Sequence, residues 1–304
     1  MPPFRNRLSL AYLVCLLFAL LAPGIAWAAC LGAVAQNPLR WPALTSPALS
    51  EPLPKPQLAG LMPAPIPVQG KAGPTQAKPG PTQAKPGDVR LTFVGHATFL
   101  IQTPGGATAA TDYNDYLRPA VVPDIATMNY AHGTHFTESP DPGIKHVLRG
   151  WPYMGKPARH NLSYKDMRVR NVPTNIRRWG GGETEYDGNS IFIFEAADIC
   201  IVHLGHLHHT LTPGHLADIG QADVVLVPVD GGYTLNQVQM RDVILQLKPP
   251  LVVPMHYFSD STLERFLSLL RESHEITLSQ ESSLSLRRET LPKKPTVMVL
   301  PGPH

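Results

Sequence analysis

The chain has few cysteines, little net charge and no N-terminal apolar run long enough to cross a membrane. Three cysteines among 304 residues do not indicate a disulfide framework, and Cys200, which lies in an apolar stretch, is expected to be a buried thiol. A formal net charge of +3 is too small to indicate nucleic-acid binding. The apolar run at residues 10–22 is shorter than the roughly 20 residues that a membrane-spanning helix needs.

The N-terminus has the organisation of a secretory signal peptide. Two arginines precede the apolar run, and small residues follow it up to Ala28. This order of basic, apolar and small residues predicts a signal peptide at residues 1–28 and export to the periplasm or the medium. Membrane association through the N-terminus remains an alternative. A lipid anchor on Cys30 is less expected, because Trp27 fits a lipoprotein cleavage site poorly.

Residues 29–87 are rich in proline and contain the heptapeptide GPTQAKP twice, at 73–79 and 80–86. Such a segment has too little apolar surface to offset the entropy lost on ordering. We therefore predict a disordered linker that acts as a tether.

The composition of the sequence changes at residue 88, and from there predicted strands alternate with predicted helices. Apolar runs covered on both faces are expected in the strands "SIFIFEAADICIVHLG", "ADVVLVPVD" and "PPLVVPMHY". Helices are expected at residues 212–220, at residues 234–249 with Thr234 as cap, and from Ser261 onward. This alternation predicts one layered α/β domain at residues 88–290. Residues 291–304 are expected to be a tail.

Histidines follow three separate predicted strands. Ligands bind at strand ends in α/β folds, and neutral imidazole is the commonest protein ligand of metals. Histidine at three strand ends therefore indicates a zinc-type site. The histidines at these ends are His132 and His135, then His203, His206, His208 and His209, and finally His256. His208, like His215 further along, is expected to lie at the surface or to support a neighbour.

Several motifs resemble the metallo-β-lactamase superfamily, in the order in which that family has them. They are "FVGHATFLIQTPGG", "TDY", "YAHGTH", "HLGHLHHTLTPGHLADIGQADVVLVPVDGGYTL" and "PPLVVPMHYF". The sequence looks most similar to the branch of ascorbate-6-phosphate lactonase-like and N-acyl phosphatidylethanolamine phospholipase D-like hydrolases. The resemblance covers residues 89 to about 275. It implies a four-layer αββα sandwich with metal ions at the edge between two sheets.

The sequence departs from the metal-binding pattern of that family. The motif H-x-H-x-D-H reads with Tyr130 in place of its first histidine and Thr134 in place of its aspartate. His206 stands where the family has an aspartate that bridges two metals, whereas the last histidine is kept as His256. The histidine expected after a "VP" strand is also missing, because that segment reads "NVPTNIRR".

These departures imply one metal ion instead of two. A histidine cannot bridge two cations through one nitrogen, and its other nitrogen needs a hydrogen-bond acceptor. We expect His135, His206 and His256 to hold one zinc ion, with Mn or Fe as alternatives. Three neutral imidazoles with an open position lower the pKa of a zinc-bound water to about 7. His132 or Tyr130 would be a fourth ligand or a supporting group.

The remaining site residues have two interpretations each. We expect Tyr130, His132 and Asp112 to be catalytic, with Asp112 as an acceptor behind His206, although Asp112 fits an ordinary turn equally well. His203, His209, Thr134 and His96 are expected to support the ligands or contact the substrate. For His96, a packing role is equally compatible. A basic run either recognises an anionic substrate or forms a solvated strand face; its members are Lys165, Arg168, Arg170, Arg177 and Arg178.

The sequence thus predicts an exported metal-dependent hydrolase that uses a metal-activated water on an ester, lactone or phosphodiester bond. Its expected partner is a small-molecule or lipid-like substrate, with no nucleic acid. The alternative is a metal- or ligand-binding pseudoenzyme on the same fold, favoured by the lost aspartate and histidines.

Overall fold

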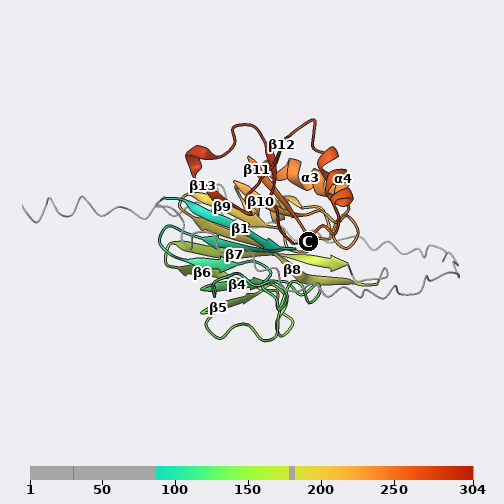
Figure 1. Cartoon of the computed structure of the whole chain (residues 1–304). Helices are drawn as coiled ribbons and strands as arrows, with labels where there is room; N and C mark the ends of the chain where they lie inside the picture. Colours follow the sequence, from blue (N-terminus) through green and yellow to red (C-terminus); the bar gives the residue numbers. More distant parts are fainter. Residues whose placement is uncertain (1–29, 31–86, 178–181, 304) are drawn as a thin grey trace, which may run out of the picture. The chain divides into compact units, whose positions relative to one another are not determined.

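The computed structural model describes residue 30, residues 87–177 and residues 182–303 (Figure 1). The predicted signal peptide and nearly all of the predicted linker lie outside the described residues. Among the described residues, no helix combines the length and the apolar character that crossing a bilayer demands.

Two β-sheets form the framework of the domain. One is six-stranded, in the order β13-β1-β2-β3-β4-β5, and the other is eight-stranded, in the order β12-β14-β11-β10-β9-β8-β7-β6. The first sheet contains β1 (Val89–Gly95), β2 (Thr98–Gln102), β3 (Thr108–Ala110), β4 (Ile125–Met128), β5 (His146–Arg149) and β13 (Ser283–Leu286). The second contains β6 (Asn161–Tyr164), β7 (Met167–Arg177), β8 (Thr184–Ala196), β9 (Ile199–His203), β10 (Val224–Pro228), β11 (Leu251–Met255), β12 (Glu275–Leu278) and β14 (Thr296–Val299).

Both faces of strand β10 are buried, which explains why its sequence is apolar throughout. Val224 and Leu226 belong to the core between the two sheets. Val225 and Val227 belong to the core on the other face of the same sheet. Successive side chains of a strand point to opposite faces, so a strand with two covered faces has no polar position. The predicted sandwich of two sheets is confirmed.

Three helices contribute buried residues to the outer core of the eight-stranded sheet, and a short 3₁₀ helix precedes β14. They are α2 (Pro213–Ile219), α3 (Gln237–Leu247), α4 (Asp260–Ser268) and η2 (Arg288–Thr290). The six-stranded sheet has a smaller core on its outer face, where Tyr113 and Ile144 are buried from loops and Phe136 and Trp151 pack against them.

Two helix starts and the C-terminal boundary differ from the sequence prediction. The cap of α3 is Asn236 and not Thr234, because the Thr234 hydroxyl donates to Asp230 Oδ2 at 2.5 Å. The cap of α4 is Ser259 and not Ser261. Residues 291–304 are not a tail, because β14 lies between β11 and β12 in the sheet. The cap of α2, by contrast, is Thr212, as predicted.

The expectation of a free buried thiol at Cys200 was wrong. Cys200 is buried, but it forms a disulfide with Cys30, 170 residues earlier in the sequence. Cys30 is also buried, and its carbonyl accepts a hydrogen bond from the Gln221 backbone amide at 2.6 Å. This pairing could not be predicted from the sequence, because Cys30 stands beside the predicted signal peptide and far from the domain in the sequence.

Candidate metal centre

The topology brings histidines from four chain segments to one edge of the sandwich. β9, β10 and β11 are parallel neighbours, so their carboxyl ends meet at one edge. His206 follows β9 and His256 follows β11, whereas His132 and His135 follow β4 in the other sheet. His96 lies in the turn between β1 and β2.

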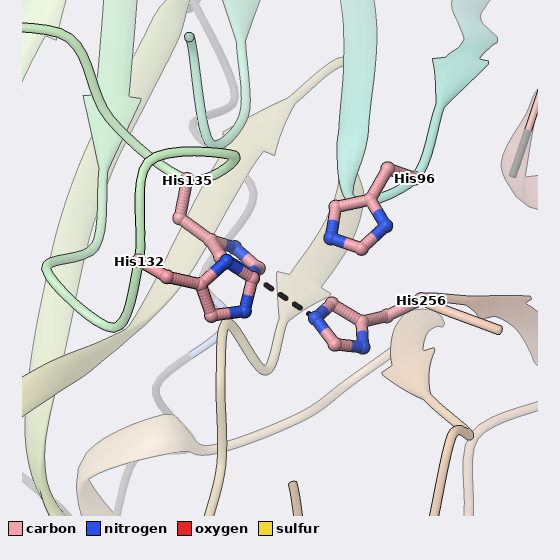
Figure 2. Close-up of side chains that lie close together, drawn as sticks. All are labelled: His96, His132, His135 and His256. Atoms are coloured by element: carbon pink, nitrogen blue, oxygen red, sulfur yellow. Dashed lines mark hydrogen bonds between the residues drawn. The ribbon is translucent and has the colours of Figure 1, made fainter. Parts of the chain in front are cut away.

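Two overlapping sets of histidines form the centre. Ligand nitrogens of His96, His132, His135 and His256 all lie within 4.8 Å of one another (Figure 2). His206 belongs to a second set, since its Nε2 lies 3.1 Å from His132 Nε2. The ring centroids of His135, His206 and His256 are 5.0 Å apart for each of the three pairs. Three imidazoles on one tetrahedral zinc ion have centroids about 5 Å apart, given Zn–N bonds of about 2.0–2.1 Å.

Asp112 fixes the ring of His135. Its Oδ2 accepts a hydrogen bond from His135 Nδ1 at 2.6 Å, and its Oδ1 accepts one from Asn129 Nδ2 at 2.9 Å. Burial raises the pKa of Asp112 to about 6. The sequence had placed this carboxylate behind His206; the structure places it behind His135. Asp112 therefore orients a site histidine as predicted, although a different one. A carboxylate bound to Nδ1 directs the lone pair of Nε2 into the centre.

Asp230 holds His256 in the same way. Its Oδ2 lies 3.1 Å from His256 Nδ1, and its Oδ1 accepts backbone hydrogen bonds from residues 232, 233 and 234. Burial alone would raise the pKa of Asp230, but the hydrogen bonds from His256 and Thr234 outweigh it and keep this pKa below its ordinary value. Asp230 was missed in the sequence, although it directly follows an apolar strand in "VPVD", as the histidines do.

The rings of His135 and His256 direct two nitrogens at one point. Their Nε2 atoms lie 3.1 Å apart (Figure 2). When both rings donate their Nδ1 protons to carboxylates, both Nε2 atoms carry lone pairs, and these repel unless a proton or a metal ion lies between them. Burial holds the pKa of His135 well below its ordinary value. The donor set therefore fits a metal ion.

His206 is oriented by a different kind of partner. Its Nδ1 lies 2.6 Å from His208 Nε2, and His208 Nδ1 accepts a hydrogen bond from the Arg177 amide at 3.1 Å. A neutral His208 that accepts at Nδ1 must donate from Nε2, so His206 accepts at Nδ1 and carries its own proton at Nε2. That proton points to His132 Nε2. Ligation by His206 therefore needs a change of tautomer.

Thr134 connects two further rings. Its hydroxyl lies 2.8 Å from His132 Nδ1 and 3.0 Å from His96 Nε2. Burial lowers the pKa of His96 to about 3 and also lowers that of His132. Thr134 stands at the position of a metal-binding aspartate in the resembled family, and here it positions imidazoles instead.

The backbone is strained at the centre. His96, Asp112 and His256 have φ angles of 52°, 40° and 54°, in the left-handed region that non-glycine residues rarely adopt. Such outliers persist where the surrounding structure determines them, and they gather at functional sites. Gly205, beside His206, has φ 59° and no room for a side chain, since a Cβ there would lie 2.5 Å from Asn129 and Asn189.

Three residues predicted for the site have contacts elsewhere. The ring of Tyr130 is 46% exposed and packs against Phe136 and Trp151. His203 is buried, with Nε2 3.0 Å from the Ala97 carbonyl and Nδ1 accepting from the Gly205 amide. His209 accepts from the Asn175 amide at Nε2 and lies 2.8 Å from the Thr210 carbonyl at Nδ1.

Three of the basic residues proposed for an anionic substrate are engaged in ion pairs. Lys165 pairs with Asp124, and Arg168 and Arg170 pair with Glu195. Arg170 also donates to two backbone carbonyls, those of residues 218 and 219. Arg177 reaches the site, because its amide contacts His208 and its guanidinium donates to the carbonyl of residue 232 at 3.3 Å. Residue 178 lies outside the described residues.

Comparison with known proteins identifies the family of this chain. The family described as "Beta-lactamase superfamily domain" matches residues 90–256. This match spans more than half of the chain, so the chain belongs to this family, the metallo-β-lactamase superfamily.

Its relatives have more specific descriptions. A "UPF0173 metal-dependent hydrolase" of Carboxydothermus hydrogenoformans is 23% identical over 56% of this chain and 84% of the relative. A UPF0173 protein of Pyrococcus furiosus is 31% identical over 60% of this chain and 91% of the relative. A crystal structure from Thermotoga maritima, described as that of a candidate Zn-dependent hydrolase of the same superfamily, has a TM-score of 0.53 and 27% identity, over 71% of this chain and all of that one.

Proposed function

We propose that the protein is an exported hydrolase that depends on a single divalent cation, most simply zinc. His135 and His256 hold the cation, and His132 and His206 complete its ligands. The observation that carries this proposal is the contact of 3.1 Å between His135 Nε2 and His256 Nε2, which directs two nitrogens of buried rings at one point when both Nδ1 protons go to carboxylates. Membership of a family whose relatives are named metal-dependent hydrolases supports the same reading.

The surroundings of the ligands suit one cation. Asp112 and Asp230 lie behind two of the imidazoles and supply two negative charges without occupying ligand positions. Carboxylates in this place orient the rings and make them more basic. We prefer His206 to His96 as a ligand because the ring of His206 is 5.0 Å from those of both His135 and His256, the even spacing of imidazoles on one tetrahedral ion. The ring of His96 lies 5.3 Å from that of His135 and 4.2 Å from that of His256, and its Nε2 contacts the Thr134 hydroxyl.

The proposed chemistry depends on a cation bound by imidazoles and on the partial exposure of His132. When bound, a divalent cation polarises a carbonyl or phosphoryl oxygen and lets water act as a nucleophile near neutral pH. His132 is only partly buried, unlike His135, His206 and His256, so it is the imidazole nearest to an incoming substrate. His132 is thus suited to exchange places with water and to accept or donate a proton at Nε2. The bond attacked would be that of an ester, a lactone or a phosphodiester.

The disulfide between Cys30 and Cys200 supports export. Disulfides persist in oxidising compartments and are rare in the cytosol. The same sulfur of Cys30 cannot carry a lipid while it is bonded to Cys200. We therefore favour a soluble protein in the periplasm or the medium over a lipoprotein.

Metal analysis of protein purified without a histidine tag tests the proposal. We expect about one equivalent of metal per chain, lost in His256→Ala and in His206→Ala. His274→Ala is the matched control, because His274 lies outside the site and contacts Ser273. A panel of p-nitrophenyl esters, lactones and phosphodiesters then measures metal-dependent hydrolysis.

Each alternative gives a different result. Two equivalents of metal would overturn the mononuclear centre. Loss of metal in His96→Ala but not in His206→Ala would show that His96, and not His206, is a ligand. A protein that takes up no metal would be a ligand-binding pseudoenzyme and not a metal-dependent hydrolase.

A further inference from the structure

Two exposed aromatic rings adjoin the histidine centre. Phe258 lies two residues after His256, and its ring centroid is 5.4 Å from that of His256 and 5.7 Å from that of His96. Tyr233 packs edge-on against Phe258, with centroids 5.5 Å apart. The two rings come from the loops that follow β11 and β10. We call Phe258 and Tyr233 the aromatic platform.

The platform is exposed although apolar surface is costly in water. Phe258 is 53% exposed and Tyr233 is 46% exposed. Exposed apolar residues that gather beside a polar site commonly form its ligand-binding wall.

The charges nearby do not favour an anionic substrate. Lys165, Arg168 and Arg170 are engaged with carboxylates, as described above. Among the described members of the basic run, this leaves Arg177, which already donates to the carbonyl of residue 232. Among these described residues, recognition of an anion would therefore rest on the exposed guanidinium of Arg177, whereas an apolar group could pack against two aromatic rings.

We propose that the substrate presents an uncharged aromatic or similarly flat apolar group to the aromatic platform, next to the bond that is cleaved. This inference rests on the proposed function, since it assumes a metal ion among the histidines. Phe258 is then a specificity-determining residue. It contacts the rings of two site histidines, so a group bound on it lies beside the reacting atoms.

Hydroxamic acids with the same metal-binding head and different tails provide a direct test. Binding of acetohydroxamic, benzohydroxamic and succinic monohydroxamic acid to the zinc-loaded protein is measured by calorimetry. We expect benzohydroxamic acid to bind about tenfold more tightly than acetohydroxamic acid, because it buries an aromatic ring. Phe258→Ala should abolish this preference, measured as the ratio of the two affinities within that variant.

The control variant is Leu278→Ala, which removes an exposed apolar side chain from the edge strand β12. It should keep the full preference. Tighter binding of the succinic compound than of either neutral compound would overturn the inference and indicate an anion subsite at Arg177. Equal binding of the acetyl and benzoyl compounds, or a preference that survives in Phe258→Ala, would also overturn it.

These failures are distinct from failure of the proposed function. A protein that binds no zinc fails before any hydroxamic acid is added, and the inference then fails with the function. A protein that binds one zinc ion without selecting the benzoyl compound keeps the function and loses only the inference.

Discussion

His135 donates a hydrogen bond from Nδ1 to Asp112 Oδ2 over 2.6 Å, and neither side chain is exposed to solvent. Asp112 follows β3 and His135 follows β4, and these strands are parallel neighbours in the six-stranded sheet. Their carboxyl ends therefore present an imidazole and its acceptor together. This pairing fixes which nitrogen of His135 faces the other histidines.

Replacement of Asp112 by asparagine should weaken metal binding. The amide has the same shape but no charge, and loss of a carboxylate behind a ligating histidine typically costs about 10–100-fold in metal affinity. Competition with a chelator at pH 7.5 measures the change. An affinity for zinc equal to that of the unaltered protein would show that Asp112 does not support the centre.

The pH dependence of metal binding should have the same origin. Burial raises the pKa of Asp112 to about 6, so its carboxyl gains a proton as the pH falls through 6. Only the ionised form accepts the His135 Nδ1 proton with full strength. Zinc affinity should accordingly be level above about pH 7 and should fall as the pH drops below 6. This component should be absent in Asp112→Asn, and equal slopes for both proteins between pH 5 and pH 6.5 would contradict it.

If His206 is a ligand, metal binding should break the hydrogen bond from the Arg177 amide to His208. His206 must then carry its proton on Nδ1 and donate it to His208 Nε2, so a neutral His208 carries its proton on Nδ1 and no longer accepts from Arg177. Amide hydrogen exchange at Arg177 should therefore be faster with zinc than without it. The Asn175 amide, which donates to His209, is the internal control. Unchanged exchange at Arg177 would favour ligation by His96.

Gly205→Ala should destabilise the protein and displace His206. The new Cβ would lie 2.5 Å from side-chain atoms of Asn129 and Asn189, and crowding of this kind costs roughly 1–3 kcal/mol in addition to about 1–2 kcal/mol for the left-handed backbone. Gly155→Ala is the matched control, because its φ is 74° and nothing lies within 4 Å of its Cβ position. Urea unfolding should show a clearly larger loss for Gly205→Ala, and equal losses would refute the steric argument.

Arg170→Gln should destabilise the fold by about 3–5 kcal/mol, because it leaves the buried Glu195 carboxylate without its closest partner. Arg170 Nε lies 2.7 Å from Glu195 Oε1. Arg168 pairs with the same carboxylate at 3.4 Å and is more exposed, so Arg168→Gln should cost less than about 1 kcal/mol. Urea unfolding measures both. A stable Arg170→Gln variant with impaired substrate binding would restore Arg170 to the substrate site.

Much of the fold and part of the site could be predicted from the sequence, for identifiable reasons. Apolar strands with both faces covered leave a local pattern, as in β10, and histidines at strand ends gather because parallel strands end at one edge. Which carboxylate lies behind which histidine could not be predicted in this way. The hydrogen bond of Asp230 to His256 and the bond of Cys30 to Cys200 depend on segments that meet only after folding.

The disulfide also changes the covalent topology of the proline-rich region. Residues 29–87 were expected to be a disordered linker that acts as a tether. The disulfide joins Cys30 to Cys200 in β9, so residues 30–200 form a closed covalent ring that includes the proline-rich segment. The residues of this covalent ring include His132 and His135, whereas His206 and His256 follow it in the sequence. A protease that cuts once within residues 31–86 should therefore open the ring without separating the pieces, which would come apart on a gel only after reduction.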